Sequence, residues 1–268
     1  MIAAHPAGRA FDAMADTYDD DFTQSLIGQT QRSAVMQDAF HIFRGRRRLL
    51  ELNCGTGDDA LRFAENGWRV LALDASERMI TCARVRRENL GTRDNPQFRQ
   101  VATEDLRDIA GEFDGVFSNF SGLNCVRDLA PVARMLAEKT TSGSPLLLCL
   151  STRVCLWETA WYLLRGKPAK AFRRWTGRHQ AILQGMPVDV YYPTLNTLRN
   201  AFLPYFKLRG VRAIGLFVPP SYVESWIQKH TLLLRIFVRL DMFFSRLPLL
   251  RTLGDHMLLH FEKTGEVV

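Results

Sequence analysis

The most constraining feature of this sequence is a pair of apolar runs joined by a glycine-bearing turn. The first run, Leu49–Leu52, leads into a turn over residues 53–57 that contains Gly55 and Gly57, and the second run ends in the carboxylate of Asp74. This spacing is typical of a strand–turn–helix–strand unit. Glycines let backbone N–H groups approach a ligand closely. A carboxylate at the end of the next strand can accept hydrogen bonds from both hydroxyls of a ribose. The sequence therefore predicts a nucleotide-type pocket.

Strand and helix patterns alternate along the first 150 residues. Apolar runs predict further strands over 97–101, 113–119 and 145–150, and helical spacing predicts helices over 31–43, 58–66, 76–90, 104–109 and 129–139. Repeated β–α units of this kind predict an α/β fold with a mostly parallel sheet. We expect an N-terminal helical cap over 1–45, a Rossmann-like cofactor-binding core over 46–152, and substrate-covering insertions plus the last strands over 153–268.

The regular alternation of predicted strands and helices ends after residue 151. The patterns predict a basic aromatic helix over 157–174, strands over 188–192, 208–218 and 256–261, and a helix over 195–202. A very apolar helical region is expected over 221–250, interrupted near Pro248. We expect this region to pack mainly as core, with contact to lipid as the alternative.

Composition limits the class of protein. A chain of 268 residues with 47% hydrophobic and 24% charged residues can bury a sizeable core. Its five cysteines are scattered without metal-ligand spacing, which predicts free thiols and no metal site. Residues 1–10 lack the apolar core of a secretory signal, so the expected location is cytoplasmic, with possible peripheral contact with an anionic membrane.

The net positive charge comes from the second part of the chain. Residues 151–268 hold 17 of the 35 Lys and Arg but only 7 of the 28 Asp and Glu. The cations are densest between Arg165 and Arg178, where no acid occurs and aromatic residues such as Trp175 alternate with them. This mixture suits an interface with something anionic, although such charge runs are usually solvated helix faces.

The turn also fits the dinucleotide pattern GxGxxA over residues 55–60, so an NAD(P)-dependent oxidoreductase is one interpretation. However, Asp58 and Asp59 open the following helix, where they would repel the phosphates of a dinucleotide. S-adenosylmethionine carries a sulfonium and an amino group, which nearby carboxylates favour. A third interpretation is a non-catalytic module that binds membrane or protein.

Four ordered segments, 51–57, Asp74, 104–106 and 113–119, resemble those of class I S-adenosylmethionine-dependent methyltransferases, over roughly residues 10–152. The resemblance implies a seven-stranded Rossmann-like sheet with helices on both faces and a helical substrate cover. It implies S-adenosyl-L-methionine as cofactor and S-adenosyl-L-homocysteine as product. Members of this family usually have glycine at the position of Asn53. Ala102 occupies the position at which they often have an acidic residue that contacts the adenine.

The same resemblance assigns the cofactor-binding residues. The turn 53–57 would hold the methionine tail, Asp74 the ribose, residues 103–105 the adenine, and Asn119 and Phe120 would border the methyl group. Tyr18 lies in an aromatic-acidic segment that resembles the one closing over the cofactor. The complete predicted set is Tyr18, Asn53, Cys54, Gly55, Thr56, Gly57, Asp74, Ala75, Met79, Thr103, Glu104, Asp105, Asn119 and Phe120.

Methyl transfer from a sulfonium needs alignment more than a protein nucleophile. An acceptor can still need a base, and among His256, Asp255, His179, Tyr191 and Tyr192 we retain His256 and Tyr192 as candidates. His260 is interpreted as structural. The aromatic second half favours a small, hydrophobic acceptor and no nucleic acid. The methylated atom and the oligomeric state are left open.

Overall fold

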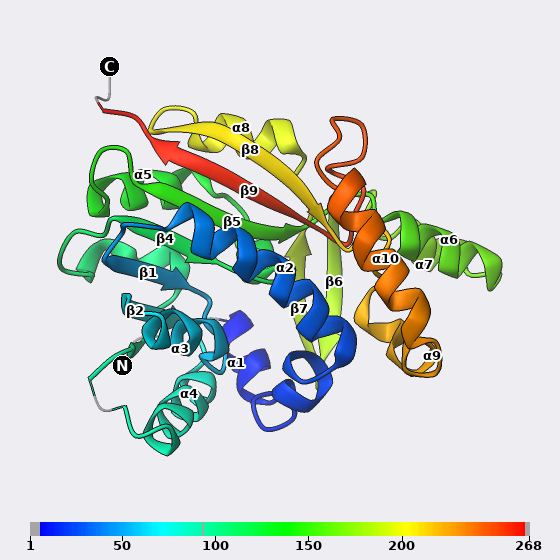
Figure 1. The fold of residues 1–268 in the computed structure, drawn as a ribbon, viewed down its shortest axis with the longest axis horizontal. Helices are drawn as coiled ribbons and strands as arrows, with labels where there is room; N and C mark the ends of the chain where they lie inside the picture. The colour runs from blue at the N-terminus through cyan, green and yellow to red at the C-terminus, as the bar shows by residue number, and fades with distance from the viewer. Residues whose placement is uncertain (1–5, 93, 266–268) are drawn as a thin grey trace.

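The computed structural model describes residues 6–92 and 94–265, and a seven-stranded sheet lies at their centre (Figure 1). The strand order is β3–β2–β1–β4–β5–β9–β8. Strands β1 to β5 pair in parallel, and β9 lies antiparallel between β5 and β8. This confirms the predicted fold class. The strand bounds are β1 Arg48–Leu52, β2 Arg69–Asp74, β3 Gln97–Gln100, β4 Gly115–Ser118, β5 Pro145–Ser151, β8 Phe206–Ile214 and β9 His256–Lys263.

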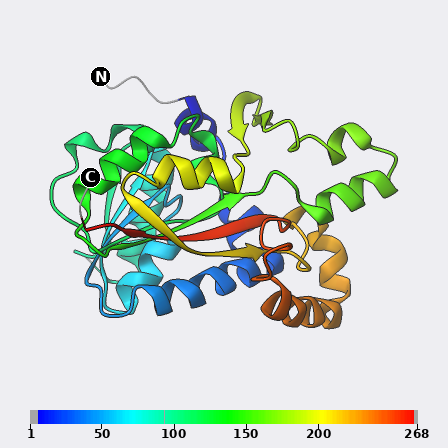
Figure 2. The ribbon, with the colours of Figure 1, turned by 90° about the horizontal axis from the view of Figure 1, so that it is seen from above.

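Helices cover both faces of the sheet, as Figures 1 and 2 show. One face packs against α2 (Leu26–Ile42), α3 (Asp58–Glu65) and α4 (Glu77–Asn89). The other packs against α5 (Ala130–Lys139) and α8 (Leu195–Phe202). Every residue of β5 is buried, as expected for a strand covered on both sides. The predicted helices and strands of the first 150 residues are thus present, with ends shifted by a few residues.

Polar caps explain where several helices begin. The side chains of Ser25, Ser76 and Thr194 accept hydrogen bonds from the backbone N–H groups three residues on, at the starts of α2, α4 and α8. Such a bond satisfies one of the four unpaired donors of a helix start.

The N-terminal segment contains a short helix, α1 (Pro6–Asp12), and a π-helix, η1 (Asp19–Thr23). The sequence predicted only an acidic turn over 16–21, so the π-helix is a correction. Two 3-10 helices, η2 (Thr103–Asp108) and η3 (Gly122–Cys125), follow β3 and β4 at the carboxyl ends of the strands. Together these four short helices surround the end of the sheet at which class α/β proteins bind ligands.

The predicted helix over 157–174 is two helices, α6 (Leu156–Leu164) and α7 (Pro168–Ala171). Gly166 between them has a φ of 67°, and Pro168 begins α7. Proline is tolerated in a first helical turn but not inside a helix, which explains the break.

A further correction concerns a hairpin that lies outside the main sheet. Strands β6 (Arg178–Leu183) and β7 (Met186–Tyr191) pair antiparallel around Gln184 and Gly185, whose φ angles are 48° and 80°. Positive φ at both central residues is the requirement of a tight hairpin turn. The sequence predicted only the second strand of this pair.

The apolar region over 221–250 forms η4 (Ser221–Val223), α9 (Glu224–Lys229) and α10 (Thr231–Phe244). Only one side of α10 packs as core, through Leu234, Phe237 and Val238. Several large apolar side chains on its other side are exposed, so the expectation of core packing is wrong for that side. Within residues 6–92 and 94–265, no helix is both long and apolar enough to cross a membrane.

Candidate functional site

The turn that follows β1 has a backbone that favours glycine. Asn53, Gly55 and Gly57 all have positive φ angles, of 55°, 54° and 80°. At Gly57 a Cβ atom would lie 2.7 Å from the ring of Phe98 and 2.9 Å from the Cβ of Ala83. Glycine is therefore required there by close packing as well as by conformation.

Asn53 stands where family members usually carry glycine, and the structure shows how it is accommodated. Asparagine adopts the left-handed conformation more readily than most residues. Its side-chain Oδ1 accepts hydrogen bonds from Thr103 Oγ1 at 3.3 Å and Ser118 Oγ at 3.4 Å. A Cβ atom at Gly122 would lie only 2.2 Å from the Cβ of Asn53, so the asparagine fits because residue 122 is a glycine.

Asp74 ends β2 and faces the turn. Its carboxylate accepts hydrogen bonds from the backbone N–H groups of Gly55 and Ser76, both at 2.9 Å. Burial raises the pKa of Asp74 above its ordinary value, while these N–H donors oppose the shift. A carboxylate oxygen has more than one lone pair, so each can accept a further hydrogen bond from a ligand.

A cavity of about 170 Å³ opens beside this turn. It lies at the carboxyl ends of β1, β2 and β4, where the topology of the sheet places ligand sites. Ten of the predicted cofactor-binding residues line it: Tyr18, Asn53, Gly55, Asp74, Ala75, Met79, Thr103, Glu104, Asn119 and Phe120.

Four predicted residues do not line this cavity. Cys54 is buried in the core beneath the turn, and Gly57 packs against Phe98. Thr56 Oγ1 donates a hydrogen bond to Asp19 at 2.7 Å. Asp105 is exposed. Any contact of these four residues with a cofactor stays a prediction.

The sequence analysis missed the roof of the cavity. Ala7, Gly8 and Phe11 of α1 line it from one side, and Val190 of β7 lines it from the other. No local sequence pattern predicts that α1 or β7 lines the cavity. The remaining missed residues, Ser121, Gly122, Cys125 and Val126, directly follow β4, and their place after that strand was the available signal.

Polar contacts hold the N-terminal segment over the cavity. Asp12 accepts hydrogen bonds from Ser76 Oγ at 2.6 Å and from the backbone N–H of Arg78 at 3.0 Å. Asp19 pairs with Arg86 and with Thr56. At Gly8, a Cβ atom would lie 2.6 Å from the carbonyl oxygen of Ala75, so α1 approaches the strand end closely. Asp12, together with Asp19 from the predicted acidic turn, therefore fastens this segment to the turn 53–57 and to α4.

The two aspartates that begin α3 are not free to attract a cationic ligand, contrary to the prediction from the sequence. Asp59 is buried and pairs with Arg32 at 2.6 Å, and Asp58 pairs with Arg62 at 2.9 Å. Asn119 Nδ2 also donates to Asp59 at 2.9 Å. Because arginines already neutralise these carboxylates, the expectation that they favour a cationic ligand is corrected.

Backbone strain marks the loop that borders the cavity after β4. Phe120 and Ser121 have φ angles of 43° and 69°, although neither is glycine. Phe120 N–H donates to the side chain of Asn119 at 3.0 Å, and Ser121 N–H donates to the carbonyl of Cys149 at 3.1 Å. Strained residues of this kind concentrate at ligand sites.

The structure does not bring the two predicted base candidates to the cavity wall. His256 packs edge-on against Phe120, with ring centroids 5.4 Å apart. Burial lowers the pKa of His256, so its ring is neutral at neutral pH, and its Nδ1 lies 3.6 Å from Asp255. Tyr192 lies beneath Arg174, and burial raises the pKa of its hydroxyl. A catalytic role for either residue stays a prediction.

Three arginines of the basic cluster between Arg165 and Arg178 form ion pairs within the protein. Arg174 is buried and bridges Glu158 and Asp255, each at 2.9 Å, so it fastens the α6–α7 extension to the residue before β9. Arg173 also pairs with Glu158, and Arg178 pairs with Asp189. The other cations of the cluster, Arg165, Lys167 and Lys170, are exposed, so contact of this cluster with something anionic stays a prediction.

Comparisons with known proteins fit this geometry. Residues 49–141 match the family model described as Methyltransferase domain. A tRNA 5-carboxymethoxyuridine methyltransferase of Escherichia coli is 29% identical over 37% of this chain. The matching part spans only 39% of that relative's length. A demethylmenaquinone methyltransferase of Leptospira interrogans is 25% identical over 70% of this chain and 79% of its own.

Solved structures share the fold. An S-adenosylmethionine-dependent methyltransferase of Clostridium acetobutylicum superposes with a TM-score of 0.61 over 95% of this chain and 99% of its own, at 10% identity. A structure from Listeria monocytogenes, described as an S-adenosylmethionine-dependent methyltransferase, gives 0.58 over 88% and 100%, at 19% identity. These comparisons confirm the predicted methyltransferase domain and the predicted fold, and they support S-adenosylmethionine as the cofactor. Residues 49–141 of this chain form a methyltransferase domain, and the chain has the class I S-adenosylmethionine-dependent methyltransferase fold.

Proposed function

We propose that this chain transfers the methyl group of S-adenosylmethionine to a small, lipophilic acceptor and releases S-adenosylhomocysteine. The observation that carries the proposal is the cavity beside the turn 53–57, which combines the Asp74 carboxylate with a largely apolar wall. When bound, the cofactor supplies a methyl group on a sulfonium, which is reactive enough for direct displacement.

The residues present fit an adenosyl ligand. Asp74 can accept hydrogen bonds from the ribose hydroxyls while it holds the amide of Gly55. Thr103 and Glu104 lie on the next strand end, where we assign the adenine. Tyr18 is half-buried against the turn, and a Cβ atom at Gly55 would lie 3.7 Å from its ring. We assign the methionine tail to the space between this ring and Asn53.

The cavity as it stands is smaller than the roughly 300–1,000 Å³ typical of small-molecule sites. Its roof is the N-terminal segment, which is held mainly by polar side chains at the surface, including Asp12 and Asp19. We therefore propose that this segment moves outward when the cofactor enters and closes again over it.

The acceptor side of the cavity is apolar. Phe11, Phe120, Val126 and Val190 surround it. Burial raises the pKa of the Cys125 thiol to about 12, so this thiol stays protonated and is no nucleophile at neutral pH. Such a wall excludes water and aligns an apolar acceptor, which are the main contributions that methyl transfer needs. The match to a demethylmenaquinone methyltransferase supports an acceptor of this class.

His256 is the base candidate that fits this proposal better. Its neutral ring contacts Phe120, which borders the site assigned to the methyl group. An acceptor with an acidic proton would need His256 to reach past Phe120. His256→Gln should then lower kcat at least tenfold with little change in cofactor affinity, and an unchanged kcat would remove His256 from the mechanism.

Cofactor binding and acceptor class can be tested separately. Calorimetry with S-adenosylhomocysteine should show one site per chain. Incubation of the chain with methyl-labelled S-adenosylmethionine and cell extract should place the label in the organic-solvent phase, as expected for a lipophilic product. A relative acts on tRNA, so purified tRNA is the alternative acceptor in a parallel reaction. Label in tRNA and none in the organic phase would contradict the proposal.

A further inference from the structure

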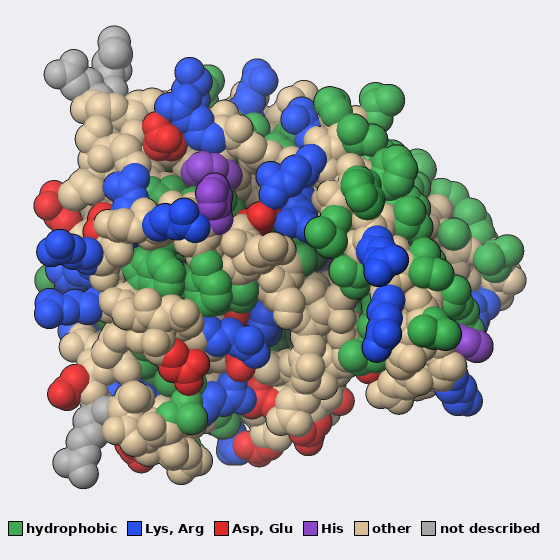
Figure 3. All heavy atoms as spheres, viewed as in Figure 1, with side chains coloured by type: hydrophobic (Ala, Val, Ile, Leu, Met, Phe, Trp, Pro, Cys, Tyr) green, Lys and Arg blue, Asp and Glu red, His purple; other side chains and the backbone are tan. Residues whose placement is uncertain are grey.

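The outward side of α10 is an unpartnered apolar surface. Leu232, Ile236 and Phe243 are exposed to 71%, 50% and 77%, and Leu249 beyond the helix to 86%. In Figure 3 these apolar side chains gather over α10, at the right of the molecule. Monomeric proteins rarely leave a contiguous apolar patch of this kind on a helix without a partner.

Arginines lie along the same side of this helix. Arg235 and Arg239 lie three and seven residues after Leu232, which places them on the same helical face, and Arg246 lies just beyond the end of α10. All three are exposed. Asp241 is the only acid over residues 231–250, and it is buried, where it accepts hydrogen bonds from the backbone N–H groups of Phe217 and Val218. The exposed surface of α10 therefore combines apolar and cationic side chains and carries no carboxylate.

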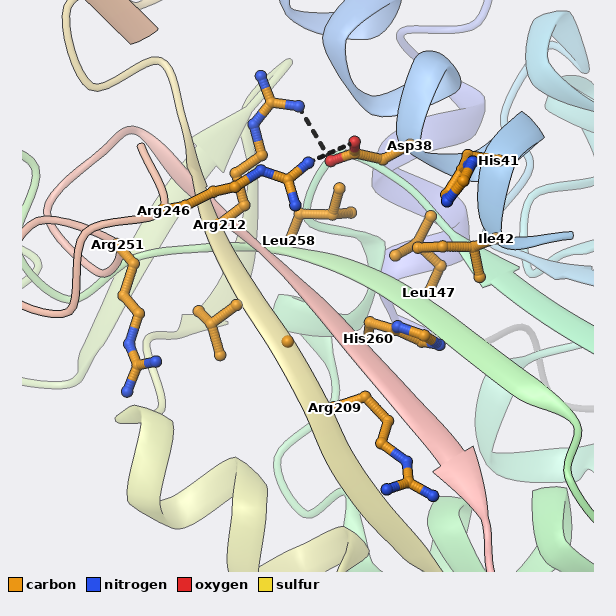
Figure 4. Close-up of a pocket in the computed structure, with 12 residues that line it drawn as sticks. Asp38, His41, Ile42, Leu147, Arg209, Arg212, Arg246, Arg251, Leu258 and His260 are labelled. Atoms are coloured by element: carbon orange, nitrogen blue, oxygen red, sulfur yellow. Dashed lines mark hydrogen bonds and ion pairs between the residues drawn. The ribbon is translucent and has the colours of Figure 1, made fainter. Parts of the chain in front are cut away.

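A basic cavity continues this surface. It has a volume of about 610 Å³ and lies between the last turns of α2 and the edge of the sheet formed by β8 and β9 (Figure 4). Leu147, Leu258 and His260 form its floor. At Gly210 the nearest atom to an added Cβ is His260 Cβ, at 3.9 Å, so the glycine leaves this part of the floor open.

The wall of this cavity is strongly cationic. Arg209, Arg212, Arg246 and Arg251 contribute guanidinium groups, and Asp38 is the one carboxylate among the lining residues, although Arg209 also pairs with Glu262 at 2.6 Å. Figure 4 shows Asp38 between Arg212 and Arg246, to which it is joined at 2.9 and 2.8 Å. Of these four arginines, only Arg251 has no carboxylate partner among the described residues. A guanidinium that lines the cavity without a carboxylate partner favours an anion as ligand here.

Arg246 joins the two features. It lies two residues after the end of α10 and also lines the cavity, and Figure 3 shows basic side chains on the same face of the molecule as the apolar surface over α10. We define the docking face as the exposed side of α10 together with this cavity. None of the residues that line the cavity also lines the proposed cofactor cavity.

We propose that the docking face binds the surface of an anionic phospholipid membrane, with one lipid phosphate in the arginine cavity. The apolar side chains of α10 would enter the boundary between headgroups and acyl chains, while Arg235 and Arg239 contact neighbouring headgroups. The 14 residues of α10 are too few to span a bilayer but suit a helix that lies in its plane. A second copy of this chain fits less well, because the same arginines would face each other.

The test is sedimentation of the full chain with vesicles. Vesicles of phosphatidylcholine with about one-third phosphatidylglycerol should bind the chain, and pure phosphatidylcholine vesicles should bind it far less. Each lost surface arginine should lower the partition constant about fivefold, so Arg235→Gln with Arg239→Gln should lower it about 25-fold. Ile236→Ser with Phe243→Ser should lower it at least tenfold. Higher salt should weaken wild-type binding.

Matched controls come from the end of α4 and from β3, which forms the opposite edge of the sheet from β8. Leu90 is exposed to 53% and Arg99 is also exposed, so Leu90→Ser with Arg99→Gln removes an exposed apolar side chain and an exposed cation far from the docking face and should bind like wild type. Circular dichroism and S-adenosylhomocysteine affinity should be unchanged in every variant, which separates loss of docking from unfolding.

The arginine cavity needs its own variant. Arg251→Gln should reduce the preference for phosphatidylglycerol over phosphatidylcholine while leaving residual binding through α10. Inorganic phosphate at constant ionic strength should compete only weakly, since it lacks the apolar contribution. Equal binding to both vesicles, or wild-type binding by the α10 variants, would overturn the proposal. So would sedimentation equilibrium showing a dimer that Ile236→Ser with Phe243→Ser dissociates.

Discussion

At the scale of single residues, Asp74 connects the sequence pattern to the chemistry. Asp74→Ala removes the acceptor proposed for the ribose and frees the Gly55 amide. We expect the affinity for S-adenosylhomocysteine to fall about 10- to 100-fold, because a charged hydrogen-bond acceptor contributes roughly 1.5–3 kcal/mol. Calorimetry measures this directly. The matched control is Asp94→Ala, an exposed carboxylate in the turn before β3, which should bind like wild type.

Asn53 and Gly122 form a pair that can be tested by a double-mutant cycle. Gly122→Ala places a methyl group against the Asn53 side chain and should lower the free energy of unfolding by about 1–3 kcal/mol. Asn53→Gly removes the obstructing atoms, so the double variant should recover most of this loss. Urea unfolding of the four proteins measures the coupling. Additive losses would show that the two residues do not constrain each other.

At the scale of elements, Asp241 fastens α10 to the chain after β8. Burial raises the pKa of Asp241 from its ordinary value of 3.8 to about 6, against the opposing effect of the Phe217 amide. The folded state thus binds more protons than the unfolded state between these values. The contribution of Asp241 to the free energy of unfolding therefore falls by about 3 kcal/mol as the pH rises from about 4 to 6, and it is constant at higher pH.

Asp241→Asn keeps an acceptor for the Phe217 amide but cannot ionise. Its free energy of unfolding should depend less on pH between 4 and 6.5 than that of the wild type, as urea titrations at several pH values would show. Asp189→Asn alters a half-buried carboxylate paired with Arg178 and serves as the comparison. If both variants retain the wild-type slope, the buried carboxylate does not titrate in this range.

At the scale of the whole molecule, one arginine joins the α6–α7 extension to the sheet. Arg174→Met would leave the buried carboxylates of Glu158 and Asp255 without their shared partner. We expect the free energy of unfolding to fall by about 3–5 kcal/mol, as for other broken buried ion pairs. Thermal unfolding measures the change. Arg178→Met breaks an exposed pair at the start of β6 and should cost about 1 kcal/mol or less.

The α/β core was predictable because its signals are local. The strand–turn–helix–strand unit with Asp74 depends on residues fewer than thirty positions apart, and buried parallel strands read as apolar runs. The hairpin β6–β7 was only half predicted, since β6 alternates between exposed and half-buried residues without a strong apolar run. Gly166 and Pro168 were a sequence signal for the break between α6 and α7. The helical spacing of the apolar residues around them led to the prediction of one continuous helix instead.

The sequence by itself determined the sheet, the glycine turn and the carboxylate at its edge, because each arises from neighbouring residues with fixed periodicity. Only the tertiary structure decided which charges form ion pairs inside the molecule and which face a ligand. Arg32 neutralises Asp59, and Asp38 meets Arg246 from 208 positions away. It also decided that α1 roofs the cavity and that one side of α10 stays exposed. Such outcomes depend on which distant segments pack together, and the spacing of residues along the chain does not predict that packing.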